Sequence, residues 1–387
     1  MRRVIPLLLF LIASGASAAE SGGAPPKVVD GIACAADPSI TYAYYLPSRY
    51  TTAQRWPIVF VFDPRKRGAV AAELFRETAE RYGWIVVSSN NTESDADAKP
   101  SVHAIQTMLP DAQKRFSVDT KRIYLAGFSG TAIIAWAVAE VTKSVAGVIG
   151  CSGRPLPDPN FHVPFAWFGT AGDQDFNYIE TMQIDRGIAA AHGVHRMENF
   201  EGTHRWAPEE VLRRGIEWME VLAMKAGTRP RDDAFVKTAF DDDLALARAE
   251  HEPLAAVRSY ETIVRTFDGL VSVDEPRRLA AELRAAPAYA QAEKEEKHAE
   301  EFELSSRVSM GRVIQAFIQS MEIPMAGSLA HDLQITSLKR LASKGSYEGL
   351  AAQRVLEGIH AQTGFYAARE VTGQKLSVLK AVSAMIR

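Results

Sequence analysis

The stretch RIYLAGFSGTAIIAW, residues 122–136, decides the fold prediction. Its first part is apolar and favours a strand, and its last part favours a helix. Between them lies GFSGT, residues 127–131. A tight turn from a strand into a helix strains its central residue, and small neighbours are needed so that the backbones do not collide. Such a turn exposes the hydroxyl of Ser129 above the edge of a sheet, which suits a nucleophile.

The motif alone leaves two interpretations open. Its fifth residue is Thr131, whereas the usual pattern G-x-S-x-G has glycine there, and a β-branched side chain fits more tightly. Ser129 could also act only as a helix cap through its hydroxyl. The residues on either side of the motif are needed to decide between a nucleophile and a cap.

Strands and helices alternate on both sides of this turn. Continuous apolar runs such as PIVFVFDP (57–64) and WIVVSSNN (84–91) are typical of strands buried on both faces. Segments with helical spacing separate such runs, and we expect Pro110 to kink or split one of them. The pattern predicts a mostly parallel α/β sheet with helices on both faces. The expected strands are 41–50, 57–64, 84–91, 122–127, 145–153, 164–172 and 195–200, and the expected helices are 69–83, 102–116, 131–142, 178–192 and 208–227.

Partners for the serine follow two later strands. Asp173 and Asp175 come after the strand at 164–172, and His204 comes after the strand at 195–200. The carboxyl ends of parallel strands meet at one edge of a sheet, so these side chains can lie close together. A serine nucleophile needs a base and a carboxylate that orients the base. His204 is the predicted base, and Asp175 is preferred as the acid. Asp173 stays the alternative, because it could equally cap the turn.

These pieces together resemble an α/β-hydrolase of the esterase or dienelactone-hydrolase-like kind. The resemblance covers about residues 40–226 and rests on the segments YYLPSRY, VFVFDPRKRG, GFSGT, GDQDFNY and FEGTHRW. It implies cleavage of an ester or related acyl bond through an acyl-enzyme, with no cofactor and no metal ion. We expect a small-molecule or polymeric acyl substrate.

The oxyanion of such a reaction needs backbone N–H donors. The N–H of Gly130 is one candidate. The second should come from the loop after the strand at 57–64, where many hydrolases carry His-Gly and this chain reads Phe-Asp-Pro-Arg. Proline has no N–H, so Arg65 is the predicted second donor.

The composition changes after about residue 230. All six tryptophans precede residue 220, and the later sequence is rich in Ala, Glu, Arg, Leu and Lys with helical spacing. We predict a hydrolase domain over 19–226, a linker over 227–235 and an all-helical domain over 236–387, with a loose spacing of tetratricopeptide type. The expected helical segments are 242–267, 277–301, 304–321, 328–343, 347–362 and 366–386.

The first 18 residues have the layout of a secretory signal peptide. A basic start precedes the apolar run VIPLLLFLIA, and Ala16-Ser17-Ala18 offers a cleavage site. This predicts an exported protein, periplasmic or secreted, without a membrane span in its mature form. An oxidising compartment would permit a disulfide between Cys34 and Cys151, although two separate buried thiols are the simpler interpretation of the sequence. No CxxC pair exists, which excludes a zinc site built from cysteines.

The net charge of -3 and the absence of a basic run give no support to a nucleic-acid partner.

Two other functions compete with an exported esterase. A weak or inactive hydrolase fold could act as a binding module, with a protein partner on its helical domain. A serine peptidase is the other alternative, because a triad does not separate ester from amide chemistry.

Overall fold

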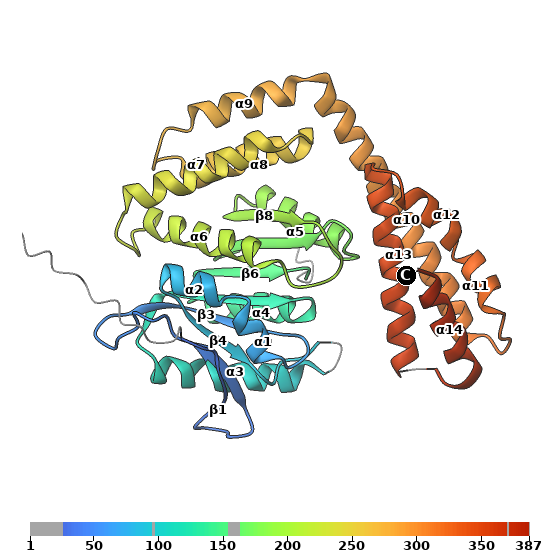
Figure 1. The fold of residues 1–387 in the computed structure, drawn as a ribbon, viewed down its shortest axis with the longest axis horizontal. Coiled ribbons are helices and arrows are strands. Elements are labelled where there is room, and N and C mark those ends of the chain that lie inside the picture. Colours follow the sequence, from blue (N-terminus) through green and yellow to red (C-terminus); the bar gives the residue numbers. More distant parts are fainter. Residues whose placement is uncertain (1–25, 95–96, 154–162, 370, 387) are drawn as a thin grey trace, which may run out of the picture.

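The computed structural model describes residues 26–94, 97–153, 163–369 and 371–386, so the predicted signal peptide lies outside the described residues. An eight-stranded sheet forms the centre of the first part of the chain (Figure 1). The strand order is β1-β2-β4-β3-β5-β6-β7-β8. β1 and β2 are antiparallel to their neighbours, and the other strands are parallel to one another. The strands are β1 (Val29–Ala33), β2 (Thr41–Tyr45), β3 (Trp56–Phe62), β4 (Ile85–Ser89), β5 (Val118–Phe128), β6 (Gly147–Cys151), β7 (Ala166–Gly172) and β8 (His195–Phe200).

The central strands are apolar throughout because helices cover both faces of the sheet. All seven residues of β3 are buried. Ile58, Phe60 and Phe62 point into one core cluster, and Val59 and Val61 point into the other, as the two-residue period of a strand requires. One face is covered by α3 (Ala98–Arg115), α4 (Gly130–Thr142) and α5 (Tyr178–Ala190), and the other by α1 (Gly68–Glu73), α2 (Arg76–Tyr82) and α6 (Glu209–Lys225). The predicted fold class is confirmed.

The register brings the carboxyl ends of the strands to one edge. Phe62 pairs with Gly127, Phe128 with Cys151, and Gly172 with Phe200. The loops that follow β3, β5, β7 and β8 therefore begin side by side. This edge is where the sequence predicts the functional residues.

Three details differ from the sequence prediction. The edge strand β1 was not expected, because most of its residues are exposed and it lacks an apolar pattern. The expected helix at 69–83 is divided into α1 and α2 at Phe75, which is fully buried and packs edge-on against Trp206. Pro110 lies inside a continuous α3. Both Pro110 and Gln106, whose carbonyl loses its helical partner, are exposed, so water can satisfy that carbonyl.

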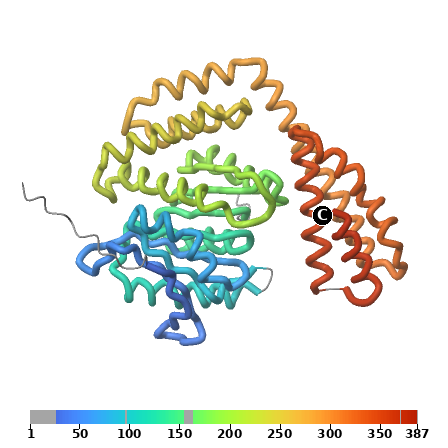
Figure 2. Tube along the Cα trace, in the orientation of Figure 1, coloured from blue at the N-terminus to red at the C-terminus, as the bar shows by residue number. Residues whose placement is uncertain are grey.

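The rest of the chain is helical, as predicted, and has two cores. α7 and α8 pack on the outer side of α6, α9 packs against α8, and α11 to α14 pack with the second half of α10 (Figure 1). α10 joins the two groups, because it contacts α8 and α9 and its second half belongs to the C-terminal core (Figure 2). The helices are α7 (Asp233–Ala249), α8 (Pro253–Phe267), α9 (Asp274–Ala285), α10 (Pro287–Gln319), α11 (Ala326–Asp332), α12 (Ile335–Ala342), α13 (Tyr347–Arg369) and α14 (Gly373–Ile386).

The helix boundaries differ from the expected segments for local reasons. The segment expected at 242–267 is divided before Pro253, where the Glu252 side chain accepts hydrogen bonds from Leu254 N and Ala255 N and caps α8. The segments expected at 277–301 and 304–321 do not match the observed α9 and α10. α10 alone has 33 residues, about the length of a whole two-helix tetratricopeptide repeat. A regular array therefore does not continue through α10. None of the helices in the described ranges is long and apolar enough to cross a bilayer.

Candidate active site

Ser129 lies at a strained turn between β5 and α4. Its φ is 56° and its ψ is -131°, which is rare for a residue with a side chain. Its N–H donates to the Cys151 carbonyl at 2.8 Å, which ties the turn to the end of β6. A Cβ at Gly127 would lie 2.4 Å from the Thr131 carbonyl oxygen, and one at Gly130 would lie 2.6 Å from the Ser94 Cβ. The two glycines are therefore steric requirements of this turn.

Thr131 has a structural role that explains why it replaces the usual glycine. Its side chain is fully buried. The hydroxyl lies 2.5 Å from the Phe62 carbonyl oxygen and 2.8 Å from that of Phe128. Thr131 thereby connects the turn to the end of β3, and the β-branched side chain fits without displacing Ser129.

Three side chains from three loops form a continuous hydrogen-bonded chain. His204 Nε2 lies 2.9 Å from Ser129 Oγ. His204 Nδ1 lies 2.9 Å and 3.0 Å from the two carboxylate oxygens of Asp175. Asp175 is fully buried, and its Oδ1 also accepts the Asn177 N–H at 2.7 Å. The carboxylate is thus held by a second donor while it contacts the imidazole.

Two aromatic rings hold the imidazole of His204. Its centroid lies 4.7 Å from that of Phe128 and 4.3 Å from that of Phe176. Phe176 follows Asp175 directly, so the loop between β7 and α5 (residues 173–177, the acid loop) supplies both a hydrogen-bond acceptor and a packing surface. Neither Phe176 nor Asn177 is among the site residues predicted from the sequence, although both lie in the segment GDQDFNY.

Asp173 lies close by but contacts a different group. Its Oδ1 accepts the Gly202 N–H at 2.9 Å, and its own N–H donates to the Phe200 carbonyl at 2.8 Å. Asp173 thus connects the acid loop to the loop between β8 and α6 that carries His204 (residues 201–208, the histidine loop). Of the two carboxylates that the sequence offered, the structure brings Asp175 to His204.

The N–H of Arg65, the predicted second oxyanion donor, already has an acceptor in the structure. The Arg65 N–H donates to Asp63 Oδ1 at 2.8 Å, so it is already engaged. The Gly130 N–H, at the start of α4, has no hydrogen-bond partner in the part of the chain that the structure describes. Gly130 can therefore offer a donor beside Ser129, and Arg65 cannot do so in this conformation.

Asp63 has a structural role in the loop after β3, where this chain lacks the usual His-Gly. Its buried carboxylate also accepts from Arg67 Nε at 3.0 Å and from Trp206 Nε1 at 3.0 Å. Burial opposes its ionisation, but the hydrogen bonds from Arg67, Trp206 and the Arg65 amide outweigh that effect and lower the pKa of Asp63. The sequence signal for this role was the Asp-Pro pair in place of His-Gly.

Replacement of Asp63 by Asn should lower the free energy of unfolding by about 1–3 kcal/mol at pH 7, because a charged acceptor is lost beneath Trp206 and Arg67. The pKa of Asp63 is lower in the folded state, so this stabilisation is present above the unfolded pKa and is lost as the pH falls through the folded pKa. Urea unfolding at pH 7, 5 and 3.5 measures the difference between variant and native protein. The difference should shrink on acidification.

Glu77→Gln, at a side chain that is 74% exposed, is the control and should change little. A difference independent of pH would contradict the assignment.

The two cysteines do not form the disulfide that the sequence permitted. Both are free and buried. Cys34 belongs to the core cluster on one face of the sheet and Cys151 to the cluster on the other, so the sheet separates the two thiols. Burial raises the pKa of each thiol to about 11.

The described residues hold no group of three or more His, Cys, Asp or Glu side chains placed to bind a metal ion. The chemistry of the site lies in the serine, the imidazole and the carboxylate. An α/β-hydrolase fold is defined by this strand order together with the strained serine turn after β5, the acid after β7 and the histidine after β8.

No family model and no curated protein matches the sequence. Among solved structures, the chain is similar to FphF, a fluorophosphonate-binding serine hydrolase of Staphylococcus aureus, with 14% identity and a TM-score of 0.42 over 51% of this chain and 99% of that one. A ferulic acid esterase is 17% identical, with a TM-score of 0.41 over 50% and 95% of the two chains. An S-formylglutathione hydrolase (FrmB) of Staphylococcus aureus is 14% identical, with a TM-score of 0.41 over 51% and 99%. The fold assignment rests on the strand order and not on these similarities.

Proposed function

We propose that this chain is a serine hydrolase that cleaves an ester or related acyl bond. The observation that carries the proposal is the unbroken chain from Ser129 Oγ through His204 to the buried carboxylate of Asp175. Such a chain activates a serine hydroxyl, which is a weak nucleophile on its own. The positive φ of Ser129 supports the same conclusion, because backbone strain of this kind is concentrated at functional turns.

In the proposed mechanism, His204 Nε2 takes the proton of Ser129 as Oγ attacks the acyl carbon. Asp175 keeps the other imidazole proton on Nδ1 and stabilises the imidazolium that forms. The Gly130 N–H donates to the developing oxyanion. His204 then protonates the leaving group, and the resulting acyl-enzyme is hydrolysed by a water molecule that His204 deprotonates.

A second candidate is a weak or inactive hydrolase fold that acts as a binding module. The observation in its favour is the Arg65 N–H, which Asp63 holds and which is therefore lost as an oxyanion donor. Loss of one donor typically lowers turnover by roughly 10²–10³-fold. The same shortage favours an ester over a peptide bond as substrate, because the less reactive amide depends more on stabilisation of the oxyanion. Export to the periplasm or outside the cell is also proposed, on the basis of the first 18 residues alone.

Fluorophosphonate labelling of the purified protein tests the proposed function. The native protein should be labelled, and peptide mapping should place the label on Ser129. Ser129→Ala and His204→Ala should both remain unlabelled while circular dichroism shows that they are folded. A folded native protein that takes up no label would overturn the catalytic proposal and favour the binding module.

A further inference from the structure

The C-terminal helices reach the acid loop of the candidate active site. Arg354 of α13 donates from Nη1 to the carbonyl oxygen of Asp173 at 2.9 Å. Its guanidinium also lies over the ring of Tyr178, 4.4 Å from the centroid. One turn further along α13, Gly358 lies beside Phe176, where an added Cβ would be 3.7 Å from the Phe176 Cβ. α13 therefore contacts residues on both sides of Asp175.

Arg354 is itself held in place by the long helix α10. Its side chain is only 7% exposed, and its Nε donates to Glu303 Oε2 at 2.7 Å. Glu303 is fully buried, and burial raises the pKa of its carboxyl to about 7, although Arg354 and Arg307 oppose that rise. Arg307, one turn along α10, pairs with Glu180 of α5 at 2.7 Å. The Arg354 guanidinium thus contacts Glu303, the Asp173 carbonyl and the Tyr178 ring. These contacts fix the position of its Nη1 donor.

The carbonyl that Arg354 contacts belongs to the residue that joins two loops of the site. Asp173 fastens the acid loop to the histidine loop through Gly202. Two residues later, Asp175 contacts His204, and Phe176 packs against the same imidazole. A shift of the Asp173 backbone would therefore move both groups that orient His204.

We propose that Arg354 is a positioning residue for His204, through its hydrogen bond to Asp173, so that the C-terminal helices are part of the active site. This inference rests on the proposed hydrolase function. A shift of about 1 Å in a reacting group can lower the rate roughly 10²-fold. The helical region would then set the geometry of the site, in addition to any partner that it binds.

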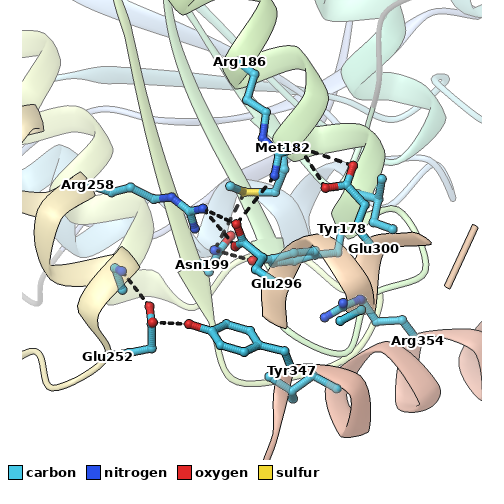
Figure 3. Close-up of a pocket in the computed structure, with 14 residues that line it drawn as sticks. Tyr178, Met182, Arg186, Asn199, Glu252, Arg258, Glu296, Glu300, Tyr347 and Arg354 are labelled. Atoms are coloured by element: carbon cyan, nitrogen blue, oxygen red, sulfur yellow. Dashed lines mark hydrogen bonds and ion pairs between the residues drawn. The ribbon is translucent and has the colours of Figure 1, made fainter. Parts of the chain in front are cut away.

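An ion pair between α5 and α10, close to Arg354, provides a control. Figure 3 shows Arg186 of α5 beside Glu300, and Arg258 of α8 beside Glu296. They line a cavity of about 170 Å³ between α5, α8, α10 and α13. Arg186 Nη1 lies 2.9 Å from Glu300 Oε2 and makes no contact with the acid loop among the interactions of the described residues. If Arg186 and Arg354 served only to hold the C-terminal helices against the first part of the chain, replacement of either arginine should change the labelling rate equally.

The test compares Arg354→Met, Arg354→Lys and Arg186→Met in the full chain, with the rate of fluorophosphonate labelling as the readout. We expect labelling to slow about 10- to 100-fold in Arg354→Met and about 3- to 10-fold in Arg354→Lys, which keeps one donor and the charge opposite Glu303. Arg186→Met should stay within about twofold of the native rate, because its contact lies away from the acid loop. A native rate in Arg354→Met, or an equal loss in Arg186→Met, would overturn the inference. If Arg354→Met does not fold, Arg354→Lys decides by the same criterion.

A second readout separates this inference from the proposed function. The proton on His204 Nδ1, hydrogen-bonded to Asp175, should give a downfield resonance in the NMR spectrum that is absent in His204→Ala. It should be lost or shifted in Arg354→Met and unchanged in Arg186→Met. An unlabelled native protein that shows these changes would contradict the hydrolase but not the positioning role. A labelled protein whose resonance is the same in every arginine variant would contradict the positioning role alone.

Discussion

Ser129→Ala is expected to lower kcat/KM for an activated ester such as p-nitrophenyl acetate by roughly 10⁴–10⁶-fold. Ser129 Oγ is the atom that His204 contacts, and alanine leaves the imidazole without a nucleophile to activate. Because the two residues act as a unit, Ser129→Ala/His204→Ala should be no slower than Ser129→Ala alone. Initial rates at enzyme concentrations high enough to detect the residual reaction measure both effects.

Ser152→Ala is the matched control for this experiment. Ser152 also follows a strand of the same sheet and also has a positive φ, of 51°. Its buried hydroxyl makes no hydrogen bond among the residues that the structure describes. Its removal should change the rate by less than about threefold. If Ser129→Ala retains native activity, the ester is hydrolysed elsewhere and the assignment of the nucleophile is wrong.

Asp175→Asn is expected to lower kcat by about 10⁴-fold. The amide has nearly the same shape as the carboxylate, but it cannot stabilise the imidazolium and it allows the proton of His204 to occupy the wrong nitrogen. The buried position of Asp175 strengthens the effect, since water cannot take its place. The rate of acyl-enzyme formation, measured as the burst with a p-nitrophenyl ester, reports this step directly.

Asp173→Asn distinguishes the two acids. Its amide oxygen can still accept the Gly202 N–H, and its backbone carbonyl can still accept from Arg354. We therefore expect Asp173→Asn to keep more than about a tenth of the native kcat. A larger loss in Asp173→Asn than in Asp175→Asn would reverse the assignment of the acid.

Local patterns in the sequence were sufficient for the fold class and for the placement of most strands. Buried parallel strands appear as continuous apolar runs. For that reason β4 lies within its predicted run, and β3 begins one residue before its own. β1 was missed because an exposed edge strand carries no such run. The division of the chain into a hydrolase domain and a helical domain remains a prediction about independent folding. α10 contributes to the core of the C-terminal bundle and also carries Glu300, which pairs with Arg186 of α5.

The order of the candidate residues was also visible in the sequence. GFSGT is recognisable because the turn requires glycines at both sides of the serine, and Asp175 and His204 each follow a strand end. Spacing along the chain could not decide between Asp173 and Asp175. Two residues that follow the same strand differ only in where the folded loop points their carboxylates.

The sequence by itself therefore determined the parallel part of the sheet, the serine turn and the edge at which an acid and a base meet, because these depend on short local patterns. Only the tertiary structure decided that Asp63 engages the Arg65 amide, that the sheet separates Cys34 from Cys151, and that Arg354 contacts a carbonyl 181 residues earlier in the chain. The physical reason is that hydrogen bonds and packing between distant segments depend on how whole layers dock, and no local pattern encodes that docking.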